Sequence, residues 1–184
     1  MGINPKGNTA IVQKAQVESL LDFRGLSIHK SNRMITKNFT SYIAGCEVRL
    51  SRMITFLIFE SKRNNVVEFN THLLNKYSEY CKAVSGKFGG EKATMISHPK
   101  SRKDLIRLIS SGILIPIVPE KKLFLINPAL TYYEGYYNEQ AWFMLRYEKA
   151  YGLFEIGAIA KEKLNQYIVN LGREYYNKCV NKNI

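Results

Sequence analysis

The chain has 184 residues, of which 46% are hydrophobic, so it is long enough for one domain with a sizeable core and is not a disordered chain. No apolar run approaches the roughly 18 residues that a membrane span requires. Residues 1–6 also lack the apolar core of a signal peptide. These features predict a soluble, intracellular protein without a membrane partner.

The formal net charge is +12, and it is unevenly distributed. Residues 1–45 carry a net +4, residues 46–131 a net +7 and residues 132–184 a net +1. Such an excess favours a polyanionic partner, and nucleic acid is the first candidate. A general basic surface or an acidic protein partner is the alternative.

The first 45 residues are predicted to form a partly ordered basic arm. A short amphipathic helix is expected within residues 12–23. The basic residues expected to add sequence-independent affinity for nucleic acid are Arg24, Lys30, Arg33 and Lys37.

Residues 46–84 are predicted to form a helix, a short strand and a second helix. A broad apolar stripe indicates a largely buried helix over residues 46–61, and Val66–Phe69 fits a strand. Apolar residues three and four apart then predict a helix that is capped by Asn70 or Thr71 and ends near Val84. A long connection over residues 85–96 follows.

Residues 98–128 are predicted to form a basic helix that leads directly into a β-hairpin. Pro99 suits the first helical turn, and Gly112 suits a left-handed residue just after the helix. Apolar segments at 113–118 and 123–128 flank a charged turn at 119–122. Pro116 cannot donate to a ladder, so the first of these strands needs an edge position or a bulge.

The helix near residue 100 is predicted to be amphipathic. At about 100° per residue, the apolar residues Leu105, Ile106, Leu108 and Ile109 share one face. Lys100, Lys103 and Arg107 share the opposite face, whereas Arg102 projects nearer to the apolar side. An ordinary solvated face is the alternative interpretation. The expected DNA-binding residues are Lys100, Arg102, Lys103, Arg107, Lys121, Lys122, His98 and Lys92.

This order of elements predicts an α+β, mainly helical fold of the winged-helix type, meaning a helix-turn-helix followed by a β-hairpin wing. The expected domains are a basic N-terminal arm (1–45), the winged helix (46–131) and a Tyr-rich helical C-terminal extension (132–184). In that extension we expect a helix over 138–151 and a last helix over 156–179 that Gly172 interrupts. Its tyrosines are expected to serve packing or self-association rather than base stacking.

The motifs of common enzymes and metal sites are absent from the sequence. Its three histidines form no metal-binding pattern, and its three cysteines form no Cys-x-x-Cys pair. Residues 86–94 lack the Gly-Lys-Ser/Thr end of a phosphate-binding loop. We therefore expect a non-enzyme without catalytic residues, metal or cofactor, and with reduced, structural cysteines.

The region from Ser110 to Leu130 resembles the winged-helix region of RepL-type plasmid replication proteins. In that family a helix ends in a glycine, an apolar strand follows, and the second wing strand closes on an Asn-Pro pair, here Asn127-Pro128. Gly135 matches a further glycine of that pattern. The resemblance covers about residues 46–150. It implies binding to a replication origin and recruitment of host replication proteins in the cytoplasm of a prokaryotic cell.

The resulting prediction is sequence-specific binding of double-stranded DNA, in plasmid or phage replication initiation. A transcriptional regulator of the same fold is one alternative. A virion-associated or structural protein–protein module, with the Tyr-rich segment as its working surface, is another. A homodimer and contacts with replication or virion proteins are left open.

Overall fold

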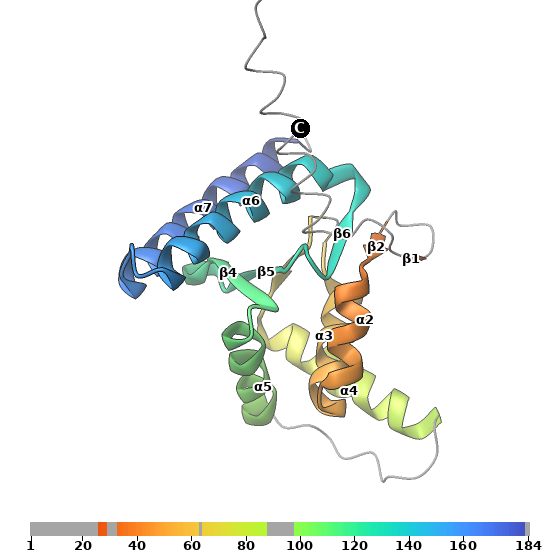
Figure 1. Ribbon diagram of the computed structural model, residues 1–184. Coiled ribbons are helices and arrows are strands. Elements are labelled where there is room, and N and C mark those ends of the chain that lie inside the picture. Colours follow the sequence, from red (N-terminus) through yellow and green to blue (C-terminus); the bar gives the residue numbers. More distant parts are fainter. Residues whose placement is uncertain (1–25, 29–32, 63, 88–97, 183–184) are drawn as a thin grey trace, which may run out of the picture.

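The computed structural model describes residues 26–28, 33–62, 64–87 and 98–182, and it is mainly helical with two small antiparallel sheets (Figure 1). The prediction of a mainly helical α+β fold is confirmed. The helix predicted within residues 12–23 lies outside the described residues. In chain order the elements are β1 (Leu26–Ile28), β2 (Arg33–Ile35), α2 (Lys37–Gly45), α3 (Val48–Glu60), β3 (Val66–Glu68), α4 (Thr71–Lys87), α5 (His98–Ser110), β4 (Leu114–Val118), the 3-10 turn η1 (Pro119–Lys121), β5 (Leu123–Ile126), β6 (Thr131–Tyr133), the 3-10 turn η2 (Glu134–Tyr136), α6 (Tyr137–Glu155) and α7 (Lys161–Asn181).

The sheet formed by β3, β5 and β4 lies at the centre of the fold. Its strand order is β3-β5-β4, and both pairings are antiparallel. β4 is therefore an edge strand, and its register shifts between Pro116 and Val118. Pro116 thus has both of the features predicted for a proline in a strand, an edge position and a bulge.

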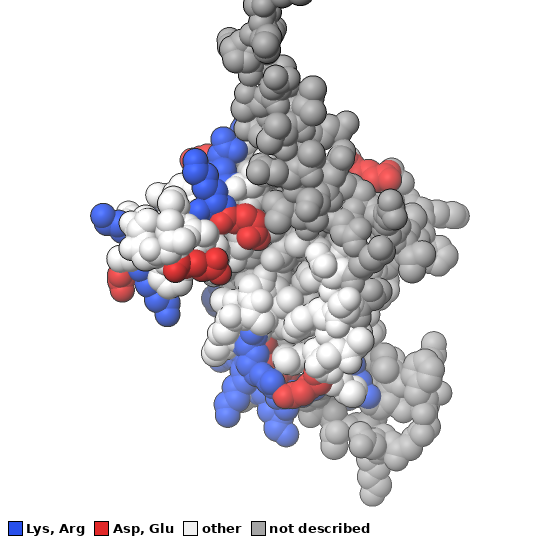
Figure 2. Space-filling model, in the orientation of Figure 1, with Lys and Arg blue, Asp and Glu red and all other residues white. Residues whose placement is uncertain are grey.

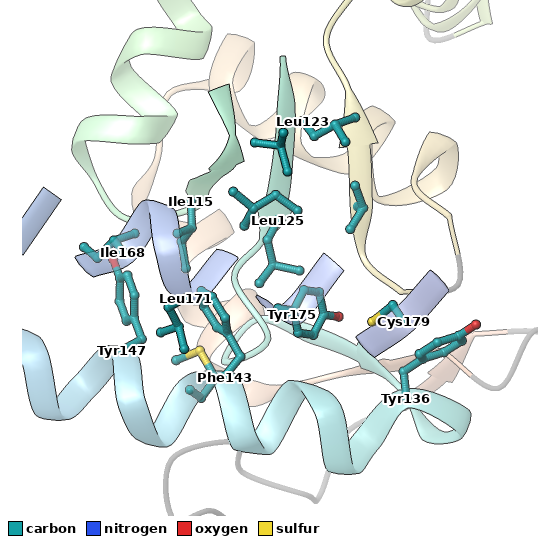
Figure 3. Close-up of a cluster of buried hydrophobic side chains, with 14 of the residues drawn as sticks. Ile115, Leu123, Leu125, Tyr136, Phe143, Tyr147, Ile168, Leu171, Tyr175 and Cys179 are labelled. Atoms are coloured by element: carbon teal, nitrogen blue, oxygen red, sulfur yellow. The ribbon is translucent and has the colours of Figure 1, made fainter. Parts of the chain in front are cut away.

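Apolar side chains alternate between the two faces of this sheet, and each face is buried in its own core. On β5, Leu123 and Leu125 belong to one core, whereas Ile126 and the half-buried Phe124 belong to the other. Figure 3 shows the first core, where the sheet meets aromatic side chains of α6 and apolar side chains of α7. The second core joins the sheet to α3, α4 and α5. The sheet is therefore the wall between two groups of helices.

The last helix, α7, runs through Gly172 without a break, so the predicted interruption is wrong. A Cβ at Gly172 would lie 2.5 Å from the Cα of Ile117 on β4. The missing side chain lets the α7 backbone approach the sheet closely, and this contact offsets the low helix propensity of glycine. The turn between α6 and α7 lies earlier, at Gly157, whose φ of 71° is left-handed.

Part of the predicted N-terminal arm is folded onto the rest of the chain. β2 pairs with β6 as well as with β1, and Arg33 stands opposite Tyr133. The Thr36 hydroxyl accepts from the Phe39 amide at the start of α2 and donates to the Ala129 carbonyl oxygen, 2.6 Å away. β6 itself spans the predicted boundary at residue 131. The described residues before position 46 are therefore more ordered than predicted.

None of the helices in the described residues is long and apolar enough to cross a membrane. The same residues contain no group of three or more His, Cys, Asp or Glu side chains placed to hold a metal ion. None of the three cysteines is part of a disulfide, and Cys81 and Cys179 are buried. Burial raises the pKa of Cys179 to about 11, which keeps that thiol protonated and unreactive at neutral pH.

Candidate nucleic-acid interface

Helix α5 ends in a tight turn that feeds the chain directly into β4. The amide of Gly112 donates to the Ile109 carbonyl oxygen, and the amide of Ile113 donates to the Leu108 carbonyl oxygen. Both N···O distances are 3.0 Å. With Gly112 at a φ of 72°, these bonds form a Schellman cap, as the glycine predicted. The helix and the sheet are thereby held in a fixed relation.

Asn127 reinforces this junction from the far side of the hairpin. Its side-chain amide donates to the Gly112 carbonyl oxygen, and its backbone amide donates to the Ile113 carbonyl oxygen. Both N···O distances are 2.9 Å. Its Oδ1 also accepts from the Ala129 amide. The Asn-Pro pair therefore ties the end of β5 to the end of α5, which gives this short motif a structural role.

The buried side of α5 is anchored by an ion pair as well as by apolar contacts. Asp104 is fully buried, and its Oδ1 accepts from Nε and Nη2 of Arg49 on α3, at 3.0 and 2.7 Å. Ser101 and Leu108 are buried on the same side. These contacts fix which side of α5 faces the core.

The opposite side of α5 exposes a row of cations. Lys100, Arg102 and Lys103 are all exposed, and none of them forms an ion pair with a carboxylate of the described residues. Figure 2 shows Lys and Arg side chains gathered over this helix. Arg102, which the helical pattern placed near the apolar side, thus belongs to the exposed row. We call Lys100, Arg102 and Lys103 the α5 cation row.

Arg107 lies on the exposed side of α5 but already has a partner. Its two terminal nitrogens donate to the two carboxylate oxygens of Glu47, at 2.9 and 2.6 Å. These hydrogen bonds lower the pKa of Glu47, so its carboxylate stays charged at neutral pH. Glu47 therefore offsets the charge of Arg107 at one edge of the cation row.

The tip of the β4–β5 hairpin exposes Lys121 and Lys122, as predicted. The tip is held from two sides. The Lys122 carbonyl oxygen accepts from the Phe69 amide, and Glu120 accepts from Arg173 of α7 at 3.2 Å. Its two lysines thus sit on a short, braced turn rather than on a long projecting loop.

The cations of the α6–α7 pair differ from the cation row because several of them have partners. Arg146 and Lys178 both lie over the ring of Trp142, with centroid distances of 4.5 and 4.9 Å. Lys182 pairs with Glu139 at 2.9 Å. The remaining lysines of this pair, Lys149, Lys161 and Lys163, each lie next to an exposed acidic residue in the chain, so the cation row is the denser group of positive charges.

Several residues predicted to contact DNA lie outside what the structure describes. Lys92, Arg24 and Lys30 fall outside the described residues, and only the backbone is described at His98 and Lys37. Arg33 is described and contradicts the prediction. It is 3% exposed, donates to the Ser61 hydroxyl, and lies 4.1 Å from the ring centroid of Tyr133. Since its guanidinium is used inside the fold, it cannot serve as a contact to phosphate.

The apolar face predicted for α5 is also wrong at one position. Leu108 is fully buried and Leu105 and Ile109 are partly buried, but Ile106 is 61% exposed. Burial of Asp104 and Ser101 rotates the helix so that Ile106 faces outward between the cations. The sequence contains one indication of this orientation, because Asp104 is a lone carboxylate within a basic helix. Its partner Arg49 lies on another helix, so the pairing could not be predicted locally.

Comparisons with models of protein families, with curated proteins and with solved structures gave no significant match.

Proposed function

We propose that this chain is a DNA-binding protein that presents α5 to the major groove of double-stranded DNA. The observation that carries the proposal is the α5 cation row. Three exposed cations without carboxylate partners in the described residues stand within one turn of a helix whose other side is locked to α3. Cations in this state gain most from phosphate contacts, because no intramolecular ion pair has to be broken first.

The arrangement of elements around α5 supports the proposal. A helix is about 10–12 Å across with its side chains, and the major groove is about 12 Å wide. The order α3, β3, α4, α5, β4, β5 with the sheet order β3-β5-β4 agrees with a winged helix, in which the strand before the second helix pairs with the last strand. On this interpretation α5 is the recognition helix and Lys121 and Lys122 lie on the wing.

Initiation of plasmid or phage replication is the biological role we propose for this activity. It follows from the resemblance of residues 110–130 to RepL-type proteins. A transcriptional regulator would use the same interface. Loss of a plasmid on deletion of the gene supports replication, whereas altered promoter output with a stable plasmid supports regulation.

The Tyr-rich segment gives less support to a structural module. Tyr132, Tyr133, Tyr136 and Tyr147 are buried, and Tyr175 is fully buried with its hydroxyl donating to the Asn64 carbonyl oxygen at 2.7 Å. These side chains are part of the core, as the packing interpretation predicted. They are not available as a surface for stacked bases or for a partner.

The test is fluorescence anisotropy of the whole protein on a random-sequence DNA duplex, titrated with salt. Affinity should fall steeply as salt rises. The triple variant K100A/R102A/K103A should reduce the log–log slope by about 0.9 for each phosphate that it no longer neutralises. A wild-type protein that does not bind duplex at low salt would overturn the proposal.

A matched triple variant separates this surface from net charge alone. K149A/K161A/K163A removes three exposed lysines from the α6–α7 pair, so it changes the net charge by the same amount. It should leave the salt slope close to that of the wild type. Equal reductions in both triple variants would mean that general basicity, rather than α5, holds the DNA.

A further inference from the structure

Ile106 is a large apolar side chain exposed in the middle of a basic helix face. It is 61% exposed on α5, where Arg102 precedes it by four residues and Lys103 by three. Residues at these spacings are neighbours on a helix surface, about 5–6 Å apart. An aliphatic side chain therefore stands directly beside two cations that have no carboxylate partner in the described residues.

An exposed aliphatic side chain beside two cations limits which kinds of partner surface can fit α5. The flanking cations favour a surface rich in negative charge, and Ile106 favours an apolar group at its centre. In the major groove the phosphates supply the negative charge, and the 5-methyl group of thymine is the apolar group that projects from the bases. A purely ionic surface would leave Ile106 against charged groups and would gain nothing from it.

We infer that Ile106 reads the 5-methyl group of a thymine in the major groove and so sets part of the sequence specificity. This inference rests on the proposed function. The neighbouring Arg102 and Lys103 are within reach of a guanine edge or of the flanking phosphates. Because base pairs are stacked about 3.4 Å apart, side chains 5–6 Å apart on α5 address positions one or two base steps from the thymine.

The experiment begins with selection of preferred sites by the wild-type protein from a random duplex library. Each thymine of the selected site is then replaced by deoxyuridine, which lacks only the methyl group, and affinity is measured by anisotropy. One replacement should weaken wild-type binding roughly fourfold, as expected when one methyl group is no longer buried. Ile106→Ala should bind the thymine duplex more weakly and should no longer distinguish it from the deoxyuridine duplex.

Ile156→Ala is the control, because Ile156 is also a highly exposed isoleucine (77%) but lies in the turn between α6 and α7. This variant should retain the fourfold discrimination. Thermal unfolding should show that Ile106→Ala is folded, since the side chain it shortens is exposed.

Several results would overturn the inference while leaving DNA binding intact. These are selection without any preferred site, equal affinity for every deoxyuridine duplex, or unchanged methyl discrimination in Ile106→Ala. Dissociation of a wild-type dimer by Ile106→Ala, with discrimination unchanged, would assign the side chain to self-association. Failure of the wild type to bind any duplex would instead remove the proposed function itself.

Discussion

Helices α5 and α7 lie on opposite sides of the β3-β5-β4 sheet and use their surfaces in different ways. α7 lies against β4 along its apolar side and approaches it closely at Gly172. Figure 1 shows α6 and α7 side by side on one side of the sheet and α5 on the other. α5 joins the sheet through its C-terminal end and anchors its buried side to α3 through Asp104.

The charges of the two helices differ in the same way. Several cations of α6 and α7 lie over aromatic rings or pair with carboxylates, whereas Lys100, Arg102 and Lys103 have no carboxylate partner in the described residues. A basic composition therefore does not by itself locate a nucleic-acid interface. Lys149, Lys161 and Lys163 also form no ion pair in the described residues, but each lies next to an exposed acidic residue in the chain. What distinguishes α5 is that its three cations lie within four residues (100–103) that include no carboxylate.

The largest expected effect concerns the approach of α7 to the sheet. Gly172→Ala should destabilise the protein by about 1–3 kcal/mol, because the added Cβ would meet the backbone of Ile117 and force the helix away from the sheet. Chemical denaturation measures this change in the free energy of unfolding. The contrast with α5 predicts that any DNA affinity of the folded variant is unchanged.

Gly152→Ala is the matched control in α6. A Cβ at Gly152 would meet no heavy atom within 4 Å outside the adjacent backbone of its own helix, so the substitution should stabilise the helix by about 0.5–1 kcal/mol. If both alanine variants had the same sign, the close contact at Gly172 would not be the cause.

Local sequence signals predicted the α5 region well. Pro99 and Gly112 mark the two ends of the helix, and two apolar runs on either side of a charged turn mark β4 and β5. Each of these features depends on residues close together in the chain. Helix ends, turns and periodicity were therefore predictable from the sequence alone.

The features that prediction missed depend on contacts between distant residues. β2 and β6 are three-residue strands, and Arg33 is buried because it meets Tyr133 and Ser61. Ile106 is exposed because Asp104 turns inward to reach Arg49. No local pattern carries these pairings, and for that reason the helix-face assignment at Ile106 and the arm assignment at Arg33 were wrong.

A smaller effect is expected at the ion pair that orients α5. Asp104→Asn should destabilise the protein by about 1–2 kcal/mol, because the amide cannot replace the charge-assisted hydrogen bonds to Arg49, which is itself partly solvated. Thermal unfolding of this variant, of Arg49→Ala and of the double variant gives the coupling between the two residues. Additive effects would show that the pair does not act as a unit.

The smallest expected effect concerns Glu47, which offsets the charge of Arg107 at the edge of the cation row. Glu47→Gln removes a negative charge next to the proposed DNA contacts and releases Arg107, so affinity for random duplex should rise by about a few-fold at low salt. The unfolding temperature should hardly change, because both side chains of the pair are exposed and surface ion pairs contribute little to stability. Glu139→Gln breaks the ion pair to Lys182, away from α5, and should leave DNA affinity unchanged.

Lowering the pH to 5 should not neutralise Glu47 and so should not reproduce the effect of Glu47→Gln. The hydrogen bonds from Arg107 lower the pKa of Glu47 below its ordinary value of 4.5, so the carboxylate remains charged as the pH falls through 4.5 and the pair is lost only below that point. DNA affinity of the wild type should therefore show no step attributable to Glu47 between pH 7 and pH 5. A rise in wild-type affinity in that range that is absent from Glu47→Gln would mean that Arg107 does not hold the carboxylate in its charged form.

The Glu139→Gln control has its own contrary outcome. A gain in affinity from Glu139→Gln as large as that from Glu47→Gln would show that overall charge, not the edge of the cation row, governs binding.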